Sequence, residues 1–224
     1  MLDSFLRPTQ IKTNQDGGLL RLIACVCMFI DHAGKMLFPQ LTWMRMVGRL
    51  AFPLFAYGIA LGAAMTRHPR QYIARVAALA LVSQPLYAVA LGHTNEAMYA
   101  VPFAQHPLRA LCTFYMESWE KPSILLALLL GLLLLLCLRE KQYVPALLIY
   151  VLCARFSAEL DYGVSGIGLM VVFYLFLEHP ALCFAASTAY MLVWSADGHG
   201  YPLFCIEFGM RIFATPAVML ASLP

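Results

Sequence analysis

The chain has 224 residues, of which 62% are hydrophobic and 12% are charged, and its formal net charge is +3. Its mean hydropathy is +0.74. Soluble domains are close to half apolar and about a quarter charged, so this composition excludes an ordinary soluble fold. The excess of apolar residues predicts a membrane protein. The polar start of the chain is followed by no cleavage site, so we expect the first apolar run to remain as a membrane helix.

Apolar runs long enough to cross a bilayer recur along the whole chain. A crossing helix needs roughly 20 mainly apolar residues, within a range of about 17 to 25. In chain order, the sequence predicts eight such helices, at 19–38, 47–64, 71–91, 122–138, 143–157, 164–178, 180–196 and 203–222. The fifth and sixth runs are short, so seven or nine helices remain open. The predicted fold is an all-α, polytopic membrane helical bundle that forms one domain, 1–224.

Basic residues in short loops predict the orientation, because such loops stay on the cytoplasmic side. On an eight-helix path, one side collects Arg7, Lys12, Arg67, Arg70, Arg75, Arg139 and Lys141. We therefore expect a bacterial inner-membrane protein with a cytoplasmic N-terminus. Lys35, Arg45 and Arg49 fall on the opposite side, where they break the rule and indicate a functional cluster.

The first predicted helix contains Arg21, Asp31, His32 and Lys35, and ionisable groups inside a membrane are functional candidates. Arg21 and His32 are eleven residues apart, which places them on one face, about 16 Å apart along the axis. Asp31 and Lys35 could simply neutralise each other, Arg21 could reach the lipid headgroups, and His32 could be a core histidine. Because adjacent helical residues diverge, a partner for His32 must come from another helix.

The second predicted helix starts with Arg45 and Arg49, which share one helix face. Gly48 permits close approach to another backbone, and Pro53 kinks the span. The short connection brings this segment beside the end of the first helix, so we expect Arg49 to reach Asp31 or His32. The alternative is a pair of arginines that binds lipid headgroups.

A third polar group lies in the turn 158–168, where Asp161 and Tyr162 precede three glycines. These residues are candidate substrate contacts, and the alternative is a simple polar loop. Seven cysteines lie mostly in apolar runs and include no Cys-x-x-Cys pair. We therefore expect neither a disulfide framework nor a metal site.

Four segments of the sequence resemble the TraX family. They are RLIACVCMFIDHAG (21–34), VGRLAFPLFAYGIALG (47–62), TRHPRQYIARVAALALVSQPLYAVALG (66–92) and LDYGVSGIGLMVVFYL (160–175). The Asp-His-x-Gly and Gly-Arg-x-x-Phe-Pro pieces are the most specific. The resemblance implies an inner-membrane N-acetyltransferase that uses acetyl-CoA to acetylate a conjugative pilin. Related membrane acyltransferases have a basic residue and a His separated by ten residues on their first helix, which is the spacing of Arg21 and His32.

By this resemblance, His32 is the catalytic residue and Arg21 contacts the phosphates of the coenzyme. We expect three groups of site residues: Asp31, Lys35 and Arg49 beside His32; Arg67, Arg70 and Arg75 with Arg21 at acetyl-CoA; and Arg45, Asp161 and Tyr162 at the acceptor. The expected partners are a pilin subunit and membrane lipids, without metal or nucleic acid. Two alternatives stay open: a non-catalytic pilin-maturation or assembly factor, and a small-solute transporter with broken helices.

Overall fold

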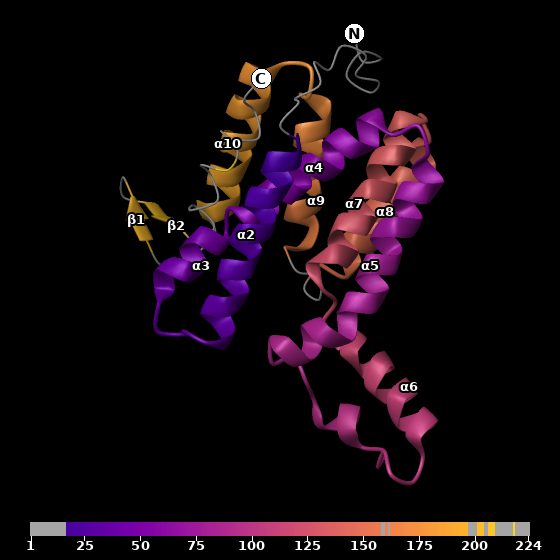
Figure 1. Cartoon of the computed structure of the whole chain (residues 1–224). Helices are drawn as coiled ribbons and strands as arrows, with labels where there is room; N and C mark the ends of the chain where they lie inside the picture. Colours follow the sequence, from indigo (N-terminus) through magenta and orange to yellow (C-terminus); the bar gives the residue numbers. More distant parts are fainter. Residues whose placement is uncertain are drawn as a thin grey trace.

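The computed structural model describes residues 17–157, 160, 162–196, 201–203, 206–208 and 217. This part of the chain is predominantly α-helical, as predicted (Figure 1). The α-helices are α2 (Gly17–Met36), α3 (Thr42–Gly48), α4 (Ala51–Met65), α5 (Pro69–Ala90), α6 (Pro107–Glu117), α7 (Ile124–Arg139), α8 (Tyr143–Arg155), α9 (Gly163–Leu175) and α10 (Pro180–Ala196). The 3-10 helices η1 (Glu96–Tyr99) and η2 (Ser118–Glu120) and the strands β1 (Tyr201–Leu203) and β2 (Ile206–Phe208) complete it.

The predicted second helix is divided into α3 and α4, and the break lies at Arg49 and Leu50. Pro53 explains the position of this break. Its ring would clash with the carbonyl of Arg49 in a continuous helix. In the first turn of α4, by contrast, its missing N–H costs no helical hydrogen bond. The break therefore places the Arg49 side chain at a helix end instead of within a regular span.

Two further predictions are wrong in part. The predicted helices 71–91 and 122–138 leave 92–121 as a loop between them, but this segment contains η1, α6 and η2. The helix α6 extends beyond the ends of the other helices (Figure 1). Within the predicted helix 203–222, the structure instead has β2, which pairs antiparallel with β1, with Tyr201 opposite Phe208. Aromatic and β-branched residues favour such pairing, and a short apolar run does not distinguish strand from helix.

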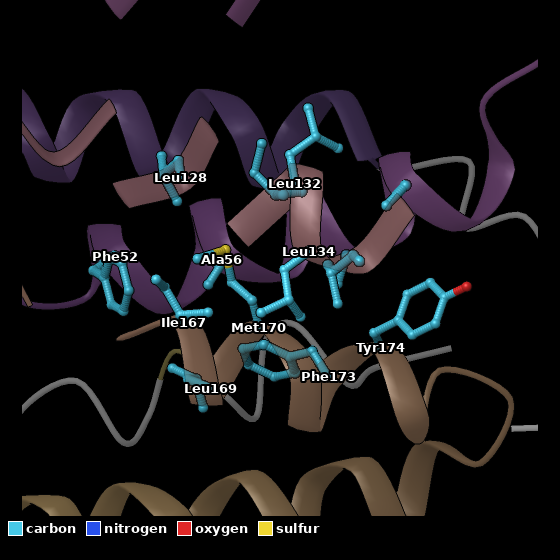
Figure 2. Close-up of a cluster of buried hydrophobic side chains, with 14 of the residues drawn as sticks. Phe52, Ala56, Leu128, Leu132, Leu134, Ile167, Leu169, Met170, Phe173 and Tyr174 are labelled. Atoms are coloured by element: carbon cyan, nitrogen blue, oxygen red, sulfur yellow. The ribbon is translucent and has the colours of Figure 1, made fainter. Parts of the chain in front are cut away.

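The centre of the bundle is a cluster of buried side chains from α4, α7 and α9 (Figure 2). Phe52 belongs to α4, Leu132 to α7, and Phe173 to α9, and each is at most 1% exposed. Gly131 on α7 leaves room for the end of Met170, because a Cβ there would overlap it. This packed centre is the support on which α2 and α5 lie, α2 against α4 and α5 against α7.

Large apolar side chains also cover outer surfaces of the bundle, such as Phe29 on α2, Val82 on α5 and Val144 on α8, each more than two-thirds exposed. Among the described residues, Thr42–Met65 and Pro69–Ala90 are long and apolar enough to cross a membrane. The bent pair Pro107–Glu120 and Ile124–Arg139, with an angle of 68°, would make a third. Exposed apolar surface of this kind indicates a membrane protein, whereas the count of eight crossings stays a prediction.

The two ends of the bundle differ in the residues that gather there. Arg139 at the end of α7 donates hydrogen bonds of 3.0 and 2.9 Å to the carbonyls of Ala63 and Thr66 at the end of α4. Arg21 and Arg67 line one cavity beside this turn. We call this the basic end. The structure thus places these basic residues together, as the predicted path requires, while the side of the membrane that they face stays a prediction.

Candidate active site

A cavity of about 600 Å³ lies at the opposite end of the bundle, and we call it the polar cavity. Six of the residues singled out from the sequence line it: Asp31, His32, Lys35, Arg45, Arg49 and Tyr162. They come from α2, from α3 and the residue after it, and from the residue that precedes α9. The structure therefore brings together residues that lie as far apart in sequence as 31 and 162.

Asp31 is held by the α3 segment. Its Oδ2 accepts a hydrogen bond of 3.3 Å from Arg45 Nη1, and the two side chains form an ion pair. Gly48 makes this approach possible, because a Cβ at position 48 would overlap the Cβ and Oδ1 of Asp31. We expected Arg49 to reach Asp31 or His32, and the structure shows an ion pair of Asp31 with Arg45, one helical turn before Arg49. Lys35 contacts a residue outside α2 as well, with its Nζ 3.3 Å from Nε2 of His93.

Arg49 instead donates a hydrogen bond of 3.3 Å to the hydroxyl of Tyr162. Tyr162 precedes α9 in the left-handed region, with φ of 64°, which is uncommon for a bulky residue. Its ring stacks on Phe52 at a centroid distance of 4.0 Å and meets the edge of Trp194 at 6.0 Å. Such strained backbones persist where the surroundings fix them. These contacts fix the Tyr162 hydroxyl on the wall of the polar cavity.

The second cavity, of about 720 Å³, lies at the basic end, and we call it the basic cavity. Arg21 of α2, Arg67 of the α4–α5 turn and Arg75 of α5 line it together with mostly apolar side chains. Arg70, predicted to belong to the same face, is exposed in the first turn of α5 and does not line this cavity. Three of the four expected arginines therefore surround one space.

The third cavity, of about 270 Å³, is walled by α2, α5 and α7 and is almost entirely apolar, so we call it the apolar cavity. His32 lines both this cavity and the polar cavity. Leu125 lines both this cavity and the basic cavity, and Phe55 lines the basic and the polar cavities. The three cavities therefore adjoin one another, and His32 lies on the boundary between two of them.

The sequence alone did not identify several residues that line the polar cavity. They are Tyr87, His93, Lys121, Ser157, Ser165 and Trp194. His93 directly follows Gly92, whose φ is 69°, and a glycine at the end of a predicted helix followed by a histidine was a usable signal. Asp161 lies outside the described residues. Among the described residues, no group of three or more His, Cys, Asp or Glu is placed to hold a metal ion.

Comparisons with known proteins agree with the resemblance in the sequence. A probable fimbrial assembly protein FimC, serogroup H1, of Dichelobacter nodosus is 26% identical over 165 residues, 71% of this chain and 60% of that protein. Protein TraX of Escherichia coli is 34% identical over 69 residues, 31% of this chain and 28% of that protein. An uncharacterized protein of Rickettsia prowazekii is 48% identical over 48 residues, 21% of this chain and 19% of that protein.

These matches span between 19% and 60% of the length of the relatives. No solved structure matches the chain. The sequence model of the family described as "TraX protein" matches residues 16–219, which is most of the chain. The chain belongs to the TraX family.

Proposed function

We propose that this protein is an inner-membrane acetyltransferase that moves the acetyl group of cytoplasmic acetyl-CoA to the N-terminal amine of a pilin subunit. Membership of the TraX family and a relative named as a fimbrial assembly protein support a role in pilin maturation. The observation that carries the catalytic part is the position of His32, on the boundary of the polar and apolar cavities. The basic cavity adjoins both.

The basic cavity fits the donor. Acetyl-CoA has several phosphate charges at one end and a long, largely uncharged arm. Arg21, Arg67 and Arg75 line this cavity, and guanidinium groups bind phosphate through two parallel hydrogen bonds. The three turns of α2 between Arg21 and His32 span about 16 Å. The arm would cover that distance along apolar walls, and Arg70 would add positive potential at the entrance. In this arrangement the basic end faces the cytoplasm.

The polar cavity fits the transfer step. A free α-amine has a pKa of about 7.7–8.0, so near neutral pH it is mostly protonated and does not attack. The ammonium group first loses one proton to water. His32 would then act as a general base and take a second proton from the amine nitrogen as that nitrogen bonds to the thioester carbon. Lys35 and Arg49 would stabilise the oxyanion. The intermediate then collapses, the C–S bond breaks, and the coenzyme thiolate takes the proton from His32.

The remaining predicted residues would position the acceptor. Asp31 holds Arg45 on the cavity wall through their ion pair, and Tyr162 lines the same cavity. A site closed from bulk water would limit hydrolysis of the thioester. Direct transfer and a transient acetyl-His32 both satisfy this arrangement, and a labelled protein isolated from donor alone would identify the second route.

The test is transfer of radiolabel from acetyl-CoA in vesicles that contain the purified protein and a mature pilin subunit, with mass spectrometry of the pilin N-terminus. We expect N-terminal acetylation that depends on the protein. Pilin binding without label transfer would support a non-catalytic maturation factor instead. Neither label transfer nor pilin binding, with solute uptake into the vesicles, would support a transporter.

A further inference from the structure

Ser123 precedes α7 in the position of a helix cap, with φ of −68° and ψ of 161°, but its side chain makes no capping hydrogen bond. A serine at this position normally accepts a hydrogen bond from an N–H of the first turn. Its Oγ is buried and has no hydrogen-bond partner in the described part of the chain, and the residue is 2% exposed. A buried hydroxyl without a partner costs free energy, so it points to a ligand that the hydroxyl binds.

The cavity beside this hydroxyl is the apolar cavity, which Ser123 and His32 both line. Ile124, the first residue of α7, lines both the apolar and the polar cavity. The first N–H groups of a helix have no acceptor within the helix, and the helix dipole adds partial positive charge there. The 16-residue helix α7 therefore begins beside the space that His32 lines.

Gln84 of α5 holds the start of α7 in place. Its side chain is fully buried, and its Nε2 donates hydrogen bonds to the carbonyls of Ser118 and Lys121 at 2.5 and 3.1 Å. Its Oε1 accepts a hydrogen bond of 2.9 Å from the backbone N–H of Ser123. These three bonds attach the turn before α7 to α5. They fix the backbone at the start of α7, so its N–H groups need little reorganisation when charge develops on a ligand.

From these observations we infer that Ser123 and the N-terminus of α7 bind the thioester carbonyl oxygen of the acyl donor. This inference rests on the proposed acetyl transfer. Ser123 lines the apolar cavity, and in the proposed arrangement its side chain takes the staggered rotamer that turns the hydroxyl to this space. When the amine attacks, the C=O bond becomes a C–O⁻ single bond, and Ser123 donates to that oxygen. Lys35 and Arg49 act on the same charge from the polar cavity, and Gln84 is a positioning residue.

The kinetic test is Ser123→Ala, measured as acetyl transfer at varied acetyl-CoA concentrations. Loss of one such donor lowers kcat by about 10²–10³-fold. We expect the KM of Ser123→Ala for acetyl-CoA to stay within about twofold of the wild-type value, because the contact strengthens mainly in the transition state. Ser123→Thr keeps a hydroxyl and should recover much of the rate. The matched control is Ser195→Ala, because Ser195 is also buried but its hydroxyl donates to the Leu192 carbonyl at 3.0 Å.

A spectroscopic test observes the carbonyl directly. Acetyl-CoA labelled with ¹³C at the carbonyl is bound to the His32→Ala variant, which prevents turnover, and the infrared band of the thioester is recorded. A hydrogen bond weakens the C=O bond, so we expect a lower frequency than in solution. Adding Ser123→Ala should return the band toward the solution value. Because the buried hydroxyl has no partner in the described part of the chain, we expect this change not to lower thermal stability in detergent.

Two results overturn the inference. If acetyl-CoA binds and transfers its acetyl group but Ser123→Ala alters neither kcat nor the carbonyl band, the role of Ser123 is wrong and the acetyltransferase proposal stands. If the wild-type protein binds no acetyl-CoA, the proposed donor and the Ser123 inference both fail.

Discussion

Arg49 at the end of α3 donates a hydrogen bond of 3.3 Å to the Tyr162 hydroxyl, which precedes α9. Tyr162→Phe removes this bond but keeps the stacking of the ring on Phe52. We expect the free energy of unfolding to fall by about 1 kcal/mol, the net value of one such hydrogen bond. Acetyl transfer should fall several-fold, because Arg49 loses the contact that orients it. Tyr162→Ala, which also removes the stacked ring, should destabilise the protein by about 3–5 kcal/mol. In a thermal or denaturant assay, an unaltered Tyr162→Phe protein would contradict the role of the hydroxyl, and equal losses for both variants would contradict the role of the stacked ring.

Gly48 should tolerate no side chain. Gly48→Ala places a Cβ against Asp31, so α2 and α3 must separate. We expect a loss of about 1–3 kcal/mol in the free energy of unfolding, as for other overpacked sites. The matched control is Gly58→Ala on α4, where a Cβ meets nothing within 4 Å. Alanine is the better helix former, so that variant should be unchanged or up to about 1 kcal/mol more stable. An equally stable Gly48→Ala protein would mean that α2 and α3 are packed less closely than described.

His32→Ala should abolish acetyl transfer without unfolding the protein. A general base contributes about 10²–10⁴-fold to the rate. Label transfer and thermal stability in detergent are measured together. His106→Ala is the control, because His106 precedes α6 and lines none of the three cavities. If His32→Ala keeps most of the activity, another residue is the base, and His93 on the same polar cavity becomes the first candidate.

Arg21→Lys should raise the KM for acetyl-CoA by about tenfold with a smaller change in kcat. Lysine keeps the charge but loses the paired hydrogen bonds of the guanidinium, and this loss affects ground state and transition state alike. Because Arg70 does not line the basic cavity, Arg70→Lys should change KM less. Acetyl-CoA that lacks its 3′-phosphate tests which phosphate Arg21 binds. The wild-type protein should bind this truncated donor less tightly than acetyl-CoA. The Arg21→Ala variant should bind the two donors with nearly equal affinity. If wild type and Arg21→Ala distinguish the two donors equally well, the 3′-phosphate is bound by Arg67 or Arg75 instead.

Orientation is tested by cysteine labelling from the periplasm in a variant without native cysteines. His68→Cys lies in the α4–α5 turn at the basic end, and we expect no labelling there, because short basic loops remain cytoplasmic. Ala104→Cys lies between η1 and α6, is exposed, and should be labelled. Strong periplasmic labelling at position 68 would reverse the orientation and place the basic cavity away from the cytoplasmic donor.

Local patterns in the sequence predicted which residues share one face of a single helix. The 3.6-residue period placed Arg21 and His32 on one stripe of α2, and both line the adjoining cavities. The partner of Asp31 could not be derived in this way. That partner depends on the break at Arg49, where α3 ends. The regular 3.6-residue period of one continuous helix does not predict such a break.

Contacts between residues far apart in the sequence could not be predicted from local patterns either. Gln84 and Ser123 are 39 residues apart, and their hydrogen bond exists because the segment with η1, α6 and η2 folds back on α5. A polar Gln in an apolar run marked a buried contact, but no sequence period indicated its partner. The same holds for His93, which lies beside Lys35 although 58 residues separate the two in the sequence.

Phe55 lies between the basic and the polar cavities and contributes to the walls of both. In a bilayer, these cavities belong to opposite ends of the bundle. An aromatic ring at their boundary excludes water and ions, which need polar partners throughout their path. In the proposed acetyl transfer, such a ring would allow the donor to approach from one end of the bundle and the acceptor from the other, and it would limit the passage of ions between the two cavities.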